Sequence, residues 1–425
     1  MVSSARNAAV LAVIVAALGY FVDIYDLILF GMIRVKSLNG LGITGEKEVF
    51  SQGVYLINMQ MGGMLAGGIL WGVLGDKRGR LSVLFGSIIL YSLANIANGM
   101  VDTIDQYAIC RLIAGIGLAG ELGAGITLVS ELMGPTRRGI GTTIVAALGV
   151  SGGVVAGLIG GAFGGGVDWR TAYYIGGGMG LALFALRVGV VESGMFHTSA
   201  KTNVSRGNFF QLFTSKKRFL RYIGIILVGA PIWYVIGVMF SFAKEIGGDL
   251  GLDPPPINAR ALFFCYAGCT IGGTLSGLVS QWLASRKKAL AIFVGATALS
   301  IALYFTIGGL DQTLFYVLCA FGGMASGYWA VFVSTAAELF GTNLRATVTT
   351  TVPNFVRGLV PFLTMSFQGL HAAGWSFAHS ALAVGIGSLA LAVVGLFAVP
   401  ETFGVDLDFH ETDDKAPLPV ARINQ

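Results

Sequence analysis

Long apolar runs separated by short polar segments dominate the chain. Twelve runs can be counted, and each is long enough to cross a lipid bilayer as an α-helix, which takes about 20 residues. They lie near residues 8–33, 52–75, 81–101, 106–131, 139–163, 171–191, 219–242, 258–283, 289–309, 313–337, 346–370 and 376–399. The pattern predicts an all-α membrane protein with twelve transmembrane helices.

One long polar stretch, residues 192–218, divides the apolar runs into six and six. Its cations are Lys201, Arg206, Lys216, Lys217 and Arg218. We expect a cytoplasmic linker here, between an N-terminal six-helix bundle over residues 1–191 and a C-terminal six-helix bundle over residues 219–404. A cytoplasmic tail would follow at residues 405–425.

The placement of lysine and arginine predicts the orientation, because cytoplasmic loops are enriched in these residues. With the N-terminus inside, the inner segments hold 18 of the 27 cations, the outer loops hold six and the helices hold three. The six outer cations are Arg34, Lys36, Lys47, Arg170, Lys244 and Arg260. This threefold asymmetry predicts that both termini are cytoplasmic.

Several features recur about half a chain later, which indicates an internal duplication. The charged, glycine-rich hinge at 72–80 (GVLGDKRGR) has a counterpart at 277–288 (GLVSQWLASRKK). Two pairs of an acid and an arginine are 207 residues apart: Glu131 and Arg138, then Glu338 and Arg345. The two halves are therefore expected to be related by an axis along the membrane normal, an arrangement found in transporters.

Composition agrees with a membrane protein and excludes several other classes. Only 12% of the residues are charged, about half the share in soluble proteins. The four His and four Cys lack metal-ligand spacing, and no Walker loop is present. The GxGxxG pattern at 115–120 lies in a predicted membrane helix without a βαβ unit. We expect no metal, no cofactor, no enzymatic activity and no nucleic-acid partner.

These motifs resemble those of the major facilitator superfamily. The hinge at 72–80 is similar to the family signature G-x-L-x-D-x-x-G-R, and the second copy carries Gln281 in place of the Asp. Residues 111–121 (RLIAGIGLAGE) are similar to the fourth helix of sugar porters and metabolite–proton symporters. Residues 22–31 (VDIYDLILFG) are similar to the first helix of metabolite–proton and aromatic-acid–proton symporters. The resemblance implies a monomeric secondary transporter with alternating access in a plasma membrane, such as the bacterial inner membrane.

Charged residues inside the predicted helices are the strongest functional candidates, because a charge within a bilayer is costly unless it is paired, hydrated or used. Asp23 and Asp26 share one face of the first helix. Asp26 and Arg111 lie at similar depths below the outer edge and are candidates for a pair. We interpret an Asp as the proton carrier and Arg111 as its regulator, and the resemblance favours Asp26. The alternative is a permanent structural ion pair.

Glu121 lies ten residues after Arg111, about 15 Å deeper along the fourth helix. It is interpreted as a second proton site or as the partner of a group on the fifth helix. The alternative is a carboxylate that faces the inner aqueous cavity without a specific role.

Arg357 lies near mid-depth in the eleventh run, with Asn354 about one turn before it. The second half has no acid at comparable depth, so we expect an unpaired guanidinium that binds a carboxylate substrate in a bidentate manner. The alternative is a pair with Asp23 or Asp26 across the cavity. Aromatic and amide groups near mid-depth are candidates to complete this pocket: Asn58, Gln60, Trp233, Tyr234, Tyr328 and Trp329.

Charged residues near the inner helix ends form a second candidate set. The resemblance implies that they open and close the inner side: Asp76, Arg80, Glu131, Arg138, Glu338 and Arg345. The alternative is a set of ordinary interfacial charges.

Taken with the resemblance, the buried charges favour a proton-coupled symporter that takes up a small organic acid through the lipid bilayer. The expected partners are an anionic small molecule and protons. Two alternatives stay open: a uniporter or antiporter of a neutral metabolite such as a sugar, and a receptor or sensor that binds a ligand without moving it.

Overall fold

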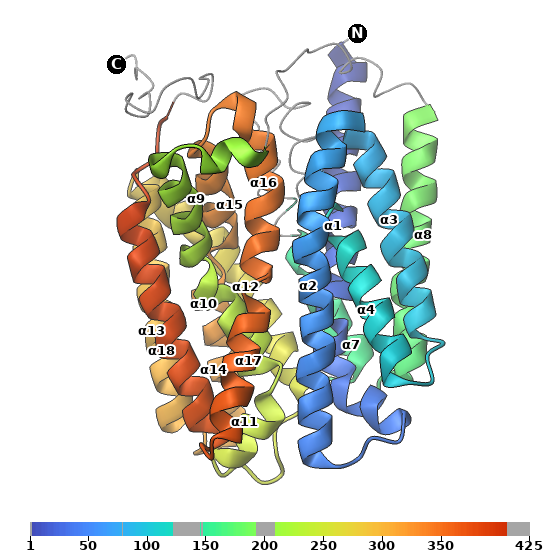
Figure 1. The fold of residues 1–425 in the computed structure, drawn as a ribbon, viewed down its shortest axis with the longest axis vertical. Helices are drawn as coiled ribbons and strands as arrows, with labels where there is room; N and C mark the ends of the chain where they lie inside the picture. The colour runs from blue at the N-terminus through green and yellow to red at the C-terminus, as the bar shows by residue number, and fades with distance from the viewer. Residues whose placement is uncertain (1, 79, 122–144, 146–147, 193–208, 406–425) are drawn as a thin grey trace.

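The computed structural model is built from helices that run along the long axis of the molecule (Figure 1). It describes residues 2–78, 80–121, 145, 148–192 and 209–405. Seven helices of these ranges are long and apolar enough to cross a membrane. We call residues 1–191 the N-terminal bundle and residues 219–404 the C-terminal bundle, following the predicted division.

The N-terminal bundle contains six described helices. They are α1 (Val2–Gly40), α2 (Glu46–Arg78), α3 (Arg80–Asn98), α4 (Ile104–Leu118), α7 (Gly152–Gly160) and α8 (Trp169–Glu192). Helix α1 packs against α2, α7 and α8, while α4 packs against α2 and α3. The first helix is therefore central to this bundle, while α4, which carries Arg111, reaches it mainly across α2 and α3.

The C-terminal bundle is more fragmented. Its elements are α9 (Lys216–Val228), α10 (Ala230–Tyr234), the π-helix η3 (Val235–Phe240), α11 (Ala243–Asp249), α12 (Asn258–Trp282), α13 (Arg286–Ile307), α14 (Gln312–Ser326), α15 (Trp329–Glu338), α16 (Thr342–Arg357), α17 (Val360–Ala372) and α18 (Phe377–Ala398). A short 3-10 helix, η2 (Phe209–Phe213), precedes them within the predicted linker. Three of the predicted single spans, the seventh, tenth and eleventh, are thus interrupted.

The interruptions have local causes. Pro231 and Pro361 lie in the first turns of α10 and α17, where a missing backbone N–H is tolerated. Gly327 and Tyr328 separate α14 from α15. Irregular backbone at membrane depth is tolerated where it is buried in protein or lines a cavity, so these breaks mark the neighbourhood of a site.

Helix α1 ends at Gly40, well beyond the end near residue 33 that the apolar run predicts. Arg34 and Lys36, predicted in an outer loop, therefore lie in the helix, and this prediction was wrong. The Lys36 ammonium donates to the carbonyls of Gly160 and Gly165, each at 3.1 Å. Both cations of this helix end have partners: Arg34 bonds to Glu245, and Lys36 bonds to the two carbonyls.

The two bundles meet through a buried ion pair at the end of the molecule remote from the termini (Figure 1). Arg34 is fully buried, and its Nη2 lies 2.5 Å from Glu245 Oε1 of α11. Its guanidinium also lies over the ring of Phe242, 4.5 Å from the centroid. Next to it, the ring of Phe50 packs edge-to-face against three phenylalanine rings of the other bundle: Phe242, Phe367 and Phe377. This end of the interface between the bundles is closed.

We expect Glu245→Ala to destabilise the protein, because it leaves the Arg34 guanidinium buried without its anion. Breaking a buried pair from one side costs about 3–5 kcal/mol, which should lower the midpoint of thermal unfolding in detergent. Asp102→Ala is the matched control, since its partner Arg170 is on the surface and the Asp102 side chain is 81% exposed. Its effect should stay within about 1 kcal/mol. Equal midpoints for the two variants would contradict this assignment.

Candidate functional site

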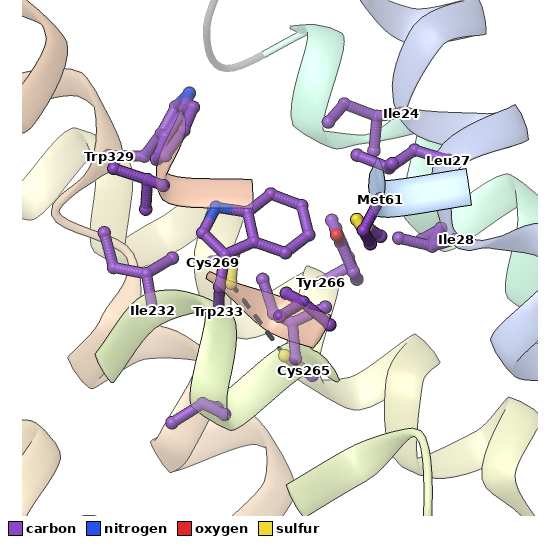
Figure 2. Packing of buried hydrophobic residues seen from close by; sticks show 14 of the residues in the cluster. Ile24, Leu27, Ile28, Met61, Ile232, Trp233, Cys265, Tyr266, Cys269 and Trp329 are labelled. Carbon is purple, nitrogen blue, oxygen red and sulfur yellow. Dashed lines mark hydrogen bonds between the residues drawn. The ribbon is translucent and has the colours of Figure 1, made fainter. Parts of the chain in front are cut away.

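A cavity of about 610 Å³, its open mouth included, lies between the two bundles. Its walls come from both: Tyr20, Ile24 and Val150 on one side, and residues of α10, η3, α12 and the α14–α15 junction on the other. Figure 2 shows the Trp233 indole between Trp329 and Tyr266, with Cys269 behind it. An apolar, aromatic cavity with few polar groups is typical of a site for a small molecule.

Arg357 reaches this region from the last turn of α16. Its Nη2 lies 3.5 Å from Asp23 Oδ2 of α1, and both side chains are fully buried. The guanidinium carbon lies 5.4 Å from the Trp233 ring centroid and 5.7 Å from that of Trp329. The expectation of an unpaired Arg357 was therefore wrong, and the alternative, a pair with Asp23 across the cavity, is what the structure contains.

Several donors around this pair have no acceptor. Among the described residues, Arg357 Nε and Nη1, Trp233 Nε1 and Trp329 Nε1 have no hydrogen-bond partner. All three side chains are at least nine-tenths buried. A buried donor without an acceptor costs about 1–3 kcal/mol, and more if it is charged. An anion bound beside these donors would supply the missing acceptors.

Asp26 and Arg111, the predicted pair, do not form an ion pair in this structure. The guanidinium of Arg111 donates from Nη2 to Gln60 Oε1 and from Nη1 to the Tyr173 hydroxyl at 3.5 Å. It also lies 4.7 Å from the centroid of the Phe30 ring. In this structure neutral acceptors on α2 and α8, and not Asp26, bind the Arg111 guanidinium.

Asp26 is fully buried, and neither of its carboxyl oxygens has a hydrogen-bond partner in the described structure. It points toward Gly176 of α8, where any side chain would collide with Asp26 Oδ1. Asp23 instead faces Arg357 of the other bundle. The two acids on one helix therefore have different surroundings.

Glu121 forms a buried pair with Arg187 of α8. Arg187 Nη1 donates to Glu121 Oε2 at 3.0 Å, and Nη2 donates to the other carboxyl oxygen. The prediction of a partner on the fifth helix was wrong, because Arg187 lies in the sixth predicted run. Arg187 was counted as a helix charge, but no role was assigned to it. Its depth was the available signal, since Glu121 and Arg187 lie 17 and 18 residues after the first residues of α4 and α8.

The predicted amide ligands are engaged elsewhere. Asn58 accepts a hydrogen bond from the Thr364 hydroxyl at 2.6 Å. Asn354 donates to the carbonyl of Ala119 at 2.8 Å. Gln60 binds Arg111. These side chains connect helices, and none of them lines the cavity between the bundles.

The predicted aromatic ligands divide in the same way. The Tyr234 hydroxyl donates to the Ala381 carbonyl at 2.7 Å, and the Tyr328 hydroxyl to the Val228 carbonyl at 2.8 Å. Trp233 and Trp329 line the cavity. Sequence depth alone did not separate these cases. Tyr20 and Tyr266, which also line the cavity, were missed for the same reason.

Of the predicted gate residues, Glu131 and Arg138 lie outside the described residues, as do the side chains of Asp76 and Arg80. Glu338 pairs with Arg286 at 3.0 Å and accepts a hydrogen bond from Thr402 at 2.7 Å. Arg345 donates to the carbonyls of Ala337 and Phe340.

Glu401, beside this inner cluster, caps the start of α13. Its carboxylate accepts from the Ser285 hydroxyl and from the backbone N–H of Arg286 at 2.8 Å. Burial raises the pKa of Glu401, but these bonds and those from the N–H of Phe403 and Thr402 lower it more, so the pKa lies below its ordinary value of 4.5.

Comparisons with known proteins agree with this architecture. A profile of the family described as Major Facilitator Superfamily matches residues 16–365. A putative metabolite transport protein of Haemophilus influenzae is 28% identical, with 93% of this chain and 97% of that protein covered. The 3-(3-hydroxy-phenyl)propionate transporter of Escherichia coli is 26% identical, with 72% and 76% covered.

One further relative and one solved structure are also similar to this chain. The niacin transporter NiaP of Acinetobacter baylyi is 24% identical, with 78% of this chain and 80% of that protein covered. Among solved structures, the proton:xylose symporter XylE bound to 6-bromo-6-deoxy-D-glucose superposes with a TM-score of 0.70 at 17% identity, covering 95% of this chain and 98% of that one. The structural likeness shows the fold alone, and it is the twelve-helix fold that the apolar pattern predicts.

We expect the start of α13 to lose protection from hydrogen exchange as the pH falls. The pKa of Glu401 is lowered by folding, so its cap contributes full stability above pH 4.5 and loses it as the pH drops through the folded pKa. The measurement is the protection factor of the first-turn amides of α13 against pH. Glu401→Gln should remove the pH dependence.

The first turn of α9, capped by the Ser215 hydroxyl, is the internal control because its cap does not titrate. A parallel loss of protection in α9 would show that general acid unfolding, and not Glu401, is responsible.

Proposed function

Because the chain belongs to the Major Facilitator Superfamily, whose members are integral membrane transporters and not enzymes, we propose that it takes up a small aromatic carboxylate together with a proton. The observation that carries this proposal is the set of unpartnered donors beside the cavity: Arg357 Nε and Nη1 and the indole N–H groups of Trp233 and Trp329.

A carboxylate satisfies these donors in a way that a neutral solute does not. A guanidinium binds a carboxylate through two parallel, charge-assisted hydrogen bonds, and each indole supplies one more donor. The Tyr266, Trp233 and Trp329 rings offer apolar faces for a flat ring on the same molecule. Two of the relatives are named for 3-(3-hydroxy-phenyl)propionate and niacin, both aromatic carboxylic acids, which supports the same class of substrate.

The buried charges support proton coupling. Around the site, the described helices bury three acids and three arginines: Asp23, Asp26, Glu121, Arg111, Arg187 and Arg357. A substrate carboxylate adds an anion, and ionised Asp23 would compete with it for Arg357. Protonation of Asp23 removes this competition, because it releases the guanidinium. One proton is therefore proposed to accompany each monocarboxylate.

The transport cycle is proposed to run by alternating access. With both termini cytoplasmic, as the cation asymmetry predicts, the end closed by Arg34 and Glu245 faces outward. Opening of this end would admit a proton and the substrate. The inner-end residues Asp76, Arg80, Glu131, Arg138, Glu338 and Arg345 are proposed to control the opposite side. We expect a monomer in a plasma membrane such as the bacterial inner membrane.

We expect Arg357→Lys to raise the KM for an aromatic monocarboxylate by about 10- to 100-fold, because the ammonium loses the bidentate geometry and the contact with the indoles. The assay is uptake into proteoliposomes with an acidic exterior, using a panel of labelled aromatic acids, aliphatic acids and sugars. Arg260→Lys is the matched control, since Arg260 contacts the Ala162 carbonyl near the closed end. A panel in which only sugars are transported would contradict the proposed substrate.

We expect Asp23→Asn and Asp26→Asn each to abolish the acidification of the vesicle lumen that accompanies uptake. Neither amide can release a proton, so exchange of labelled for unlabelled substrate should persist in at least one variant while proton flux is lost in both. Proton flux unchanged in both variants would remove these residues from the mechanism. Wild-type uptake that ignores the pH gradient would favour a uniporter, and binding without uptake would favour a receptor.

A further inference from the structure

The contacts of Arg111 show how its attraction to Asp26 is held in check. The arginine is 1% exposed. Its two described hydrogen bonds go to uncharged oxygens, those of Gln60 on α2 and Tyr173 on α8. Asp26 is an electrostatic neighbour of Arg111 and lies beside the Asn95 amide. Neither of its oxygens has a hydrogen-bond partner within bonding geometry among the described residues. An ionised carboxylate left in this way would be costly, so this arrangement favours the neutral form of Asp26.

We infer that Gln60 and Tyr173 are positioning residues that hold Arg111 away from Asp26 and thereby set how tightly Asp26 holds its proton. The inference rests on the proposed proton coupling. It reassigns Gln60, which the sequence predicted as a substrate ligand, to the proton site inside the N-terminal bundle.

The physical basis is a competition for one guanidinium. With Asp26 neutral, the amide and phenol oxygens are the better acceptors. With Asp26 ionised, a charge-assisted bond about twice as strong as a neutral one becomes available, and Arg111 is drawn to the carboxylate. Whatever free energy Gln60 and Tyr173 contribute to the protonated state is added to the affinity of Asp26 for its proton.

A second tyrosine orients the first. The hydroxyls of Tyr173 and Tyr107 lie 2.6 Å apart. A Tyr173 oxygen that accepts from Arg111 can donate its own proton to Tyr107. The Tyr107 ring is in turn stacked on Trp169 and packs edge-to-face against Phe30. This packing fixes the acceptor that faces Arg111.

Other groups that face Asp26 also act on it, and all of them are kept in the comparisons below except in Tyr173→Phe. The titratable and charged neighbours are Asp23 and Tyr25 on α1, Tyr91 on α3, Arg111 on α4 and Tyr173 on α8. The polar Asn95 of α3 lies beside them. Substitution of Gln60 by the uncharged Leu changes none of these groups and adds no charge, so its effect reports on Arg111.

The test measures protonation of Asp26 directly, on the full-length protein in lipid and without substrate. Infrared difference spectra follow the carbonyl band of protonated carboxyl groups against pH, and Asp26→Asn identifies the band. We expect Gln60→Leu to shift the midpoint of this band toward acid by roughly one pH unit, the size of one hydrogen bond to a charged group. Tyr173→Phe should shift it in the same direction.

Gln60→Glu should shift the midpoint the other way, because a second carboxylate holds Arg111 more firmly away from Asp26. Gln106→Leu and Tyr174→Phe are the matched controls and should leave the midpoint unchanged, since these side chains bond to the backbone near the loop between α3 and α4. A merely structural role for Gln60 does not produce opposite shifts from Leu and Glu.

Two results would overturn the inference: a midpoint that is the same in wild type, Gln60→Leu and Gln60→Glu, or an Asp26 band that does not titrate. An increase in KM at every pH with an unchanged midpoint would return Gln60 to the substrate site. Because the band is measured without transport, its outcome is separate from that of the proposed function. Wild-type vesicles that move no protons would refute the coupling even if the Gln60 shifts are found.

Discussion

The cost of burying charge away from water is the constraint on which the rest of this structure depends. Three acids and three arginines lie around the centre of the molecule, all within helices that pack at membrane depth. Such groups are stable only with partners, and the partners decide how the helices pack. Glu121 and Arg187 connect α4 to α8, Asp23 and Arg357 connect the two bundles, and Arg34 and Glu245 close one end of the interface.

The two bundles contribute different chemistry. Beside the cavity, the unpartnered donors of the described C-terminal bundle belong to the two indoles and to Arg357, at the break between α16 and α17, so this side of the cavity is suited to an anion. The N-terminal bundle carries the carboxyl groups, of which Asp26 has no described hydrogen-bond partner. Asp23 belongs to both regions, because it is on the helix of Asp26 and contacts Arg357. Asp23 is therefore the residue that connects the two regions.

Helix breaks position the side chains beside the cavity, and aromatic packing holds the closed end of the interface. Breaks at the π-helix after α10 and at the α14–α15 and α16–α17 junctions bring Trp233, Trp329 and Arg357 to one level. The closed end is instead held by aromatic rings and one ion pair. The proposed alternating access requires this contact between the two bundles to open and close. The inner cluster around Glu338, Arg286 and Glu401 is composed of charges that bond to helix ends and to one another.

The sequence by itself determined the membrane class, the number and order of the spans, the family, and which charged residues had to be explained. These follow from apolar length and from motifs, both of which are local along the chain. Depth along a helix was also predictable, and it places Glu121 level with Arg187. The direction in which each residue faces was decided only by tertiary structure, because near-continuous apolar runs carry little helical periodicity. That is why Gln60, Asn354, Tyr234 and Tyr328 bond to neighbouring helices while Trp233 and Trp329 line the cavity, and why Arg111 binds Gln60 and Tyr173 and not Asp26.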